Sequence, residues 1–174
     1  MFRRMLGAAA LKVTTYEEVE TDTTATTQAV LVVVLVAIAT GLGMSTSKEI
    51  WGTVIGVVVA VLGWAMWAWI TYIIGTTLFK TGETTANWAQ LARTTGFAQS
   101  PGVLNIVGLV TFGSEFLLSI VSLVTFLWTV AAMVVAVRQA LDYKSTGQAI
   151  KVVLVAAIPY FVLIVAIAVL LPEA

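Results

Sequence analysis

The charged residues that could carry chemistry lie in a short acidic stretch near the amino terminus and in loops farther along the chain. The stretch at 15–22 reads Thr-Tyr-Glu-Glu-Val-Glu-Thr-Asp. We define the charge cluster as the acids and bases expected to share one surface, namely Glu17, Glu18, Asp22, Arg93, Arg138 and Asp142. Acids beside bases at a membrane surface could bind a lipid headgroup, a divalent cation or a peptide. The competing interpretation is that these charges are solvated and pair with one another.

The absence of two residue types limits the reactions that the chain could catalyse. The chain has no cysteine and no histidine, which excludes disulfides, zinc sites with Cys or His ligands, and catalysis by a Cys nucleophile or a His base. The spacing of the acids does not single out a metal, and no pair of carboxylates has a positioned catalytic partner. We therefore expect no catalytic residue, no metal ligand, no cofactor and no enzymatic activity.

The charged residues are separated by long uncharged apolar segments, which would determine where the charges lie. Runs at 28–44, 51–79, 116–137 and 152–171 contain no Lys, Arg, Asp or Glu. Each approaches or exceeds the ~20 residues that a helix needs to cross a ~30 Å hydrocarbon layer. Hydrophobic residues make up 60% of the chain, charged residues 10%, and the mean hydropathy is +1.02. These values predict a single all-α membrane domain over 1–174, and the absence of net charge gives no sign of a nucleic-acid partner.

A fifth span is expected between the second and third of these runs. The apolar stretch at 102–112 is too short to cross alone, so polar residues from about 92 to 100 would have to join it. A re-entrant hairpin is the competing interpretation. The segment 87–99 before it is compatible with a short helix carrying Arg93. We place the five spans near 24–44, 51–79, 94–112, 115–140 and 150–171.

The amino-terminal segment 2–13 has the pattern of an amphipathic helix. Apolar residues share one stripe, and Arg3 and Arg4 point away from it. Such a helix could lie in the membrane interface or pack against the bundle as a cytoplasmic tail. After it, Thr15 and Glu18 fit a capping box, and Asp22 is placed to cap the first span.

Basic residues predict the orientation of the spans. With five spans, eight of the nine Lys and Arg residues fall on the side of the amino terminus, and only Lys48 lies opposite. The positive-inside rule then places the amino terminus in the cytoplasm and the carboxyl terminus outside. At the cytoplasmic surface we expect Glu17, Glu18 or Asp22 to pair with Arg93 or Arg138.

Polar residues near or within the spans are few. Asn105 is the one strongly polar residue expected at depth, and Glu115 falls at the outer turn between the third and fourth spans. A membrane acid can serve ion transport, although a first-turn helix acid in water is the more ordinary role.

Several short motifs resemble the prokaryotic branch of the Yip family, the Ypt/Rab-interacting membrane proteins. They are Tyr-Glu-Glu-Val-Glu at 16–20, Gly-Phe-Ala-Gln-Ser-Pro at 96–101, Ala-Val-Arg-Gln-Ala-Leu at 136–141 and Ser-Thr-Gly-Gln-Ala-Ile at 145–150. Five spans with a cytoplasmic amino end are also similar to that family. The Asp-Leu-Tyr-Gly-Pro element and long soluble tail of the eukaryotic members are absent, which argues against Rab binding.

The resemblance implies a membrane scaffold or adaptor in a prokaryotic cell membrane that organises the membrane or partner proteins. Its expected partners are membrane lipids, a protein that the sequence does not identify, and a second copy of the chain. The alternative function is a small oligomeric transporter or channel for an ion or solute. The absence of ionisable residues in the middle of four of the spans favours the scaffold.

Overall fold

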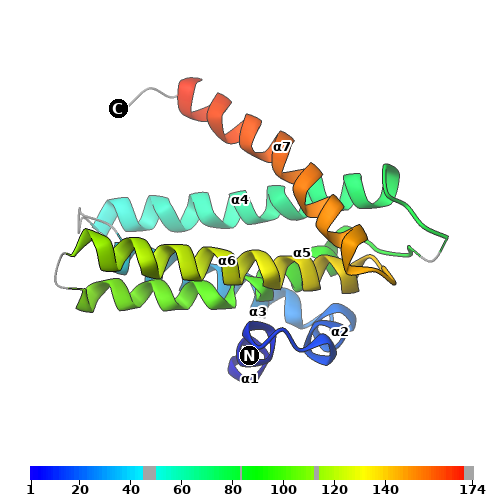
Figure 1. Cartoon of the computed structure of the whole chain (residues 1–174), viewed down its shortest axis with the longest axis horizontal. Helices are drawn as coiled ribbons and strands as arrows, with labels where there is room; N and C mark the ends of the chain where they lie inside the picture. Colours follow the sequence, from blue (N-terminus) through cyan, green and yellow to red (C-terminus); the bar gives the residue numbers. More distant parts are fainter. Residues whose placement is uncertain (45–49, 83, 112–113, 171–174) are drawn as a thin grey trace.

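The computed structural model describes residues 1–44, 50–82, 84–111 and 114–170, and these residues form a helical bundle (Figure 1). The helices are α1 (Phe2–Ala9), α2 (Val13–Thr21), α3 (Ala25–Met44), α4 (Ile50–Thr77), α5 (Trp88–Ala98), η1 (Ser100–Val110), α6 (Glu115–Ala140) and α7 (Thr146–Leu170). Four of them are long and apolar enough to cross a membrane: α3, α4, α6 and α7. They coincide with four of the five expected spans and identify an all-helical, multi-pass membrane protein.

The segment expected as the third span is divided into α5 and the 3₁₀ helix η1. Asn87 begins α5 with a capping box, in which its side chain accepts a hydrogen bond from the backbone N–H of Gln90. At the other end Gln99 joins the two helices, and Pro101 lies in the first turn of η1, where a missing N–H costs nothing. The short helix expected over 87–99 is therefore confirmed, but neither α5 nor η1 alone is long enough to cross a bilayer.

Together α5 and η1 run beside α3 in the same direction. Gly96 packs against Ala29, Gly102 against Val36, and Gly43 against the backbone at Asn105. A Cβ atom added to Gly43 would lie 1.8 Å from the carbonyl oxygen of Asn105, so only glycine permits this approach. η1 therefore lies against the far half of α3, while α5 lies against its near half.

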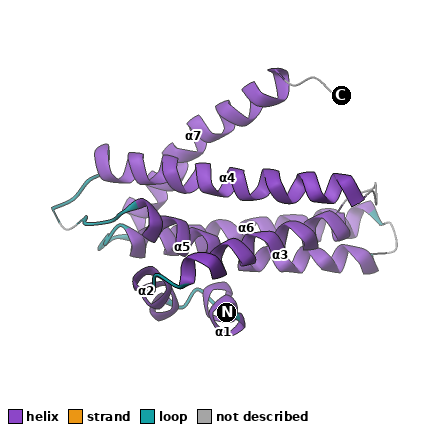
Figure 2. Cartoon of the chain, turned by 180° about the vertical axis from the view of Figure 1, so that it is seen from behind, coloured by secondary structure: helices purple, strands orange, loops and turns teal. Residues whose placement is uncertain are grey.

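α7 crosses the bundle obliquely (Figures 1 and 2). Most of its buried residues lie in its first half, and Tyr160 beyond them contacts the ring of Trp67 of α4. Ala149, Val152, Val153 and Ala156 are buried, in the cluster that also holds Ile70 and Ile74 of α4 and Val137 of α6. From Phe161 onward the described side chains are exposed. α4 and α6 have at most marginal contact with each other.

α1 and α2 lie along one side of the bundle, α1 beside its middle and α2 nearer the end where α4 and α6 finish, as Figures 1 and 2 both show. α1 ends at Ala9, and the chain turns at Leu11, whose φ is 57°. Because of this turn α2 begins at Val13, with Lys12 as its N-cap residue and no side-chain cap. The expected capping box of Thr15 and Glu18 is therefore wrong: Thr15 lies inside α2, buried against Gly7.

Candidate functional site

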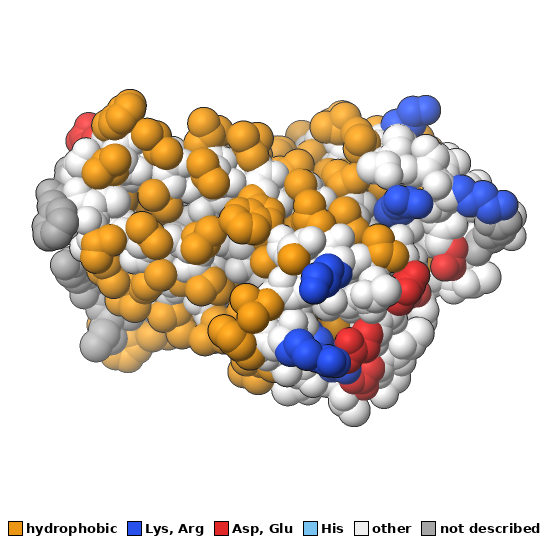
Figure 3. All heavy atoms as spheres, turned by 60° about the horizontal axis from the view of Figure 1, so that its bottom comes forward, with side chains coloured by type: hydrophobic (Ala, Val, Ile, Leu, Met, Phe, Trp, Pro, Cys, Tyr) orange, Lys and Arg blue, Asp and Glu red, His pale blue; other side chains and the backbone are white. Residues whose placement is uncertain are grey.

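Nearly all charged side chains in view gather at one end of the molecule, while apolar side chains cover the rest (Figure 3). This charged end is formed by α1, α2, the start of α5 and the loops that follow α4 and α6. The loop after α6 is tied to α4 because the Tyr143 hydroxyl donates to the carbonyl oxygens of Gly75 and Phe79, each at 3.1 Å. The loops and helices at the charged end are thus held in one arrangement.

Arg4 of α1 is the centre of an ion-pair network with α2. Its Nη2 lies 2.9 Å from Glu18 Oε1 and 2.7 Å from Asp22 Oδ2, and its Nη1 donates to Gln28 Oε1 at 3.3 Å. Arg3, which is exposed, reaches Glu18 at 3.4 Å. The network joins α1, the end of α2 and the start of α3.

Asp22 also marks the entry to α3. Its Oδ1 accepts the backbone N–H of Thr24 at 2.9 Å and the Thr24 hydroxyl at 2.6 Å. The contact is a turn two residues long that precedes α3, which begins at Ala25. The expected role of Asp22 as the N-cap of that helix is therefore wrong. The Thr24 hydroxyl, and after it Arg4, lower the pKa of Asp22 to about 2, so the carboxylate is ionised at neutral pH.

Arg93 of α5 binds the carboxyl-terminal end of α2 through backbone oxygens. Its Nε lies 3.1 Å from the carbonyl oxygen of Val19 and 3.2 Å from that of Glu20, and its Nη1 lies 3.4 Å from Thr26 Oγ1. The last four carbonyls of a helix have no partner within it, and the helix dipole favours a cation there. Arg93 is nearly fully buried. It both donates hydrogen bonds to these carbonyl oxygens and places a positive charge at this end of α2.

The expected ion pairs between Glu17, Glu18 or Asp22 and Arg93 or Arg138 are therefore wrong for the described residues. The salt bridges formed by Glu18 and Asp22 go to α1 instead. Arg138 donates to the carbonyl oxygens of Tyr143 and Lys144 and to Thr146 Oγ1, which orders the α6–α7 loop. Both arginines are occupied by backbone oxygens that the sequence does not identify as partners.

The acidic stretch nevertheless lies over the ends of α5 and α6, as expected. Glu17 Oε1 accepts from Gln139 Nε2 at 3.2 Å, and Glu20 Oε1 accepts from Gln90 Nε2 at 3.1 Å. Asp142, at φ 53°, accepts from the Thr85 hydroxyl at 3.2 Å. The structure thus brings all six members of the charge cluster to one end of the bundle.

Glu20 has an unusual environment among these acids. Burial, and after it the nearby Asp142, raise the pKa of Glu20 to about 7. Arg4 was not among the residues expected at this surface. A signal for Arg4 was present, because a basic helix followed after a short turn by an acidic helix favours pairing between the two.

Hydrogen bonds through the backbone also attach α1. The buried Tyr16 hydroxyl donates to the carbonyl oxygen of Ala8 at 3.0 Å, and Trp128 Nε1 of α6 donates to that of Ala9 at 2.7 Å. In the described part of the chain, no group of three or more Asp and Glu residues is placed to hold a metal ion. The site is built to hold α1 and α2 on the bundle.

A comparison with protein families shows to which family the chain belongs. The model of the Yip1 domain matches residues 13–170, from the first residue of α2 to the last of α7. The chain belongs to the Yip1 domain family. This confirms the family resemblance found in the sequence motifs. No curated protein and no solved structure matches the chain. α1, which carries Arg4, precedes the residues that the family model matches.

Proposed function

We propose that this Yip1 domain protein is a non-enzymatic membrane scaffold or adaptor that organises the membrane or partner proteins. The observation that carries the proposal is the attachment of α1 and α2 to the bundle by Arg4 and Arg93. These contacts fix an ordered polar surface at one end of a bundle whose spans carry no ionisable residue at mid-depth. A preorganised surface binds a partner without the cost of ordering it.

We further propose five crossings in a prokaryotic cell membrane, with the charged end in the cytoplasm and the carboxyl terminus outside. Two observations support this topology. α5 and η1 together follow α3 from its start near Ala29 to its end at Gly43, as a broken but complete crossing would. Eight of the nine basic residues then lie on the cytoplasmic side.

α1 is proposed to lie in the cytoplasmic interface of the bilayer. Phe2 is 70% exposed and Leu6 58% exposed, while Arg3 and Lys12 beside them are also exposed. Apolar side chains next to cations suit the boundary between acyl chains and anionic headgroups. The Trp128 indole that binds the end of α1 belongs to a residue type enriched at that boundary.

A flux measurement separates the scaffold from the transporter. Purified protein in liposomes is expected to pass ions and small solutes no faster than empty liposomes. Saturable uptake that Asn105→Leu or Glu115→Gln abolishes would overturn the scaffold in favour of transport.

A second measurement tests the scaffold directly. In-membrane crosslinking from cysteines placed at the charged end should trap the same neighbouring protein, or a second copy, in independent preparations. Arg93→Gln should reduce that crosslinking, whereas Lys80→Gln, at the other edge of the charged end, should not. Equal crosslinking from cysteines on the lipid-facing side of α6 would contradict a partner site at the charged end.

A further inference from the structure

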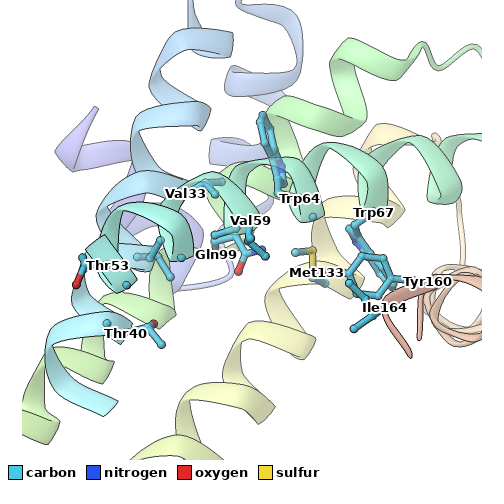
Figure 4. A pocket seen from close by; sticks show the side chains of 17 residues that line it. Val33, Thr40, Thr53, Val59, Trp64, Trp67, Gln99, Met133, Tyr160 and Ile164 are labelled. Atoms are coloured by element: carbon cyan, nitrogen blue, oxygen red, sulfur yellow. The ribbon is translucent and has the colours of Figure 1, made fainter. Parts of the chain in front are cut away.

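A groove of about 580 Å³ runs between α3 and α4 within the membrane-spanning part of the bundle (Figure 4). Thr40 and Thr53 lie at one end, Tyr160 and Ile164 of α7 close the other, and Gln99 lies between them. α7 contributes Tyr160 and Ile164 to the lining of the groove. From Thr53 to Trp67, α4 extends roughly 21 Å at 1.5 Å per residue.

Three of the eight described α4 residues that line the groove are glycines, and we call this side of the groove the glycine wall. Gly52 and Gly56 line it, and a Cβ atom added to either would meet no atom within 4 Å. These glycines are therefore not required for close packing within this chain. They leave room along the wall for an elongated apolar molecule.

Several residues that line the groove carry polar groups without a protein partner. Among the described residues, no hydrogen bond is made by the side-chain amide of Gln99 or by the hydroxyl of Tyr160. The indole nitrogens of Trp64 and Trp67 are buried and also lack an acceptor. The side chain of Trp64 is only 6% exposed and lines the groove.

Gln99 lies level with the middle of the membrane-spanning helix α3. It falls between Gly96 and Gly102, which pack against Ala29 and Val36 of α3. That level is close to the centre of α3 (Ala25–Met44). An amide without a partner at this depth is costly, because hydrocarbon offers no hydrogen bond.

The chemistry of the lining restricts what could satisfy these groups. None of the described lining residues is Lys, Arg, Asp or Glu, so a charged headgroup would have no counter-ion there. The amide of Gln99 and the hydroxyl of Tyr160 together offer three hydrogens for donation, which favours a ligand with carbonyl oxygens. A helix from a second copy would bring carbonyls already used in its own hydrogen bonds.

We propose that the groove binds an uncharged glycerolipid, with one acyl chain along the glycine wall and an ester carbonyl accepting a hydrogen bond from Gln99. Tyr160 is placed to donate a second hydrogen bond at the closed end. An uncharged lipid can reach mid-depth, whereas the headgroup of a phospholipid holds its esters near the surface. This binding site is independent of the scaffold role proposed above.

The test uses full-length protein in nanodiscs and a diacylglycerol carrying a diazirine on one acyl chain. After photolysis, labelling of α4 residues 52–63 is compared with labelling of the lipid-facing α6 residues 117–127 in the same sample. We expect the α4 segment to be labelled preferentially, and unlabelled diacylglycerol to compete at that segment only. A probe with ether linkages in place of the esters should label the α4 segment about tenfold less, the effect of one lost hydrogen bond.

Two variants probe the two halves of the site. Gly56→Leu fills open space and improves helix propensity, so it should abolish preferential α4 labelling without unfolding the protein, whereas Val58→Leu on the lipid-facing side should not. Gln99→Leu should remove the preference for ester over ether, and Gln148→Leu should keep it. Unchanged α4 labelling in Gly56→Leu, or an unchanged ester preference in Gln99→Leu, would overturn the proposal. Crosslinking of the groove to a second copy in place of lipid would do the same.

Discussion

The Nε atom of Arg93 in α5 lies 3.1 Å from the carbonyl oxygen of Val19 in the last turn of α2. This contact joins an early segment to the middle of the chain and completes the hydrogen bonding of a helix end. A carboxylate partner would have held only one side chain, whereas the carbonyl oxygens fix the backbone of α2 itself. Arg93 therefore positions the whole amino-terminal unit on the bundle.

Arg93→Gln is expected to loosen α2. Hydrogen bonds to charged groups contribute about 1.5–3 kcal/mol, so amide hydrogen exchange over residues 13–21 should accelerate about tenfold or more. Arg93→Lys should recover part of this protection, because it keeps the charge but loses the planar fork. Arg3→Gln is the control, since the Arg3 side chain is 86% exposed and its loss should change exchange little. Unaltered exchange in Arg93→Gln would contradict the role of Arg93.

Arg4→Gln should detach α1 from α2 and α3. Arg4 contacts Glu18 and Asp22 from a half-buried position, and coupling energies between residues in such contact are about 0.5–3 kcal/mol. The measurement is a double-mutant cycle of Arg4→Gln and Asp22→Asn, followed by hydrogen exchange over residues 2–9. The two changes should be clearly non-additive. Additive effects would mean that the ion pair contributes nothing to the attachment.

Docking of α2 should weaken as pH rises through neutrality. The pKa of Glu20 is about 7 in the folded protein, raised first by burial and then by Asp142, against about 4.3 for a free glutamate. Because the folded-state pKa is the higher one, the contribution of Glu20 to docking is fully present below about pH 4.3 and is lost as pH rises through about 7.

Spin labels at Thr14 and Gln148 can measure this effect. Their distance distribution should be broader at pH 8 than at pH 5.5 in the wild type. Glu20→Gln should give the same distribution at both pH values, because the amide does not titrate. A pH response that survives in Glu20→Gln would assign the effect to another group.

The apolar spans could be predicted because their physics is local. Length and lack of charge determine whether a segment can enter a bilayer, and the bounds of α3, α6 and most of α4 follow directly. The short helix before Pro101 was also predicted, but the 3₁₀ geometry of η1 after it was not. η1 lies where Gly43 of α3 closely approaches the Asn105 backbone, and such a tertiary contact between distant residues cannot be read from local sequence.

The charge cluster shows the same limit. The sequence predicted correctly that Glu17, Arg93 and Arg138 lie at one end, since span topology determines this. It predicted the wrong partners for Arg93 and Arg138. Backbone carbonyl oxygens compete with carboxylates for arginine, and because every residue has a carbonyl, the sequence does not show which one will be the partner. Gln99 was overlooked for a related reason: the groove that it lines lies between helices that are distant in the sequence.

Topology can be tested cleanly in a chain without native cysteines. In the five-span arrangement Ser47→Cys, Ser114→Cys and Ala174→Cys should react with an impermeant thiol reagent added outside. Thr85→Cys and Ser145→Cys should react only after the membrane is opened. Reaction of Ser145→Cys from outside would rule out five crossings, whereas α3, α4, α6 and α7 would still span.

The position of α1 in the membrane interface can be measured by depth-dependent quenching. Phe2→Cys and Leu6→Cys, labelled with an environment-sensitive fluorophore, should show blue-shifted emission and strong quenching by lipids brominated near the headgroup. Ala10→Cys, at an exposed site on the turn after α1, is the matched control and should emit as in water. The insertion should deepen with anionic lipid, because Arg3 and Lys12 lie beside the apolar residues and each basic group near such a surface contributes about 1 kcal/mol. Water-like emission from both Phe2→Cys and Leu6→Cys in anionic vesicles would place α1 in the cytoplasm, where its exposed apolar side chains would be free to meet a protein.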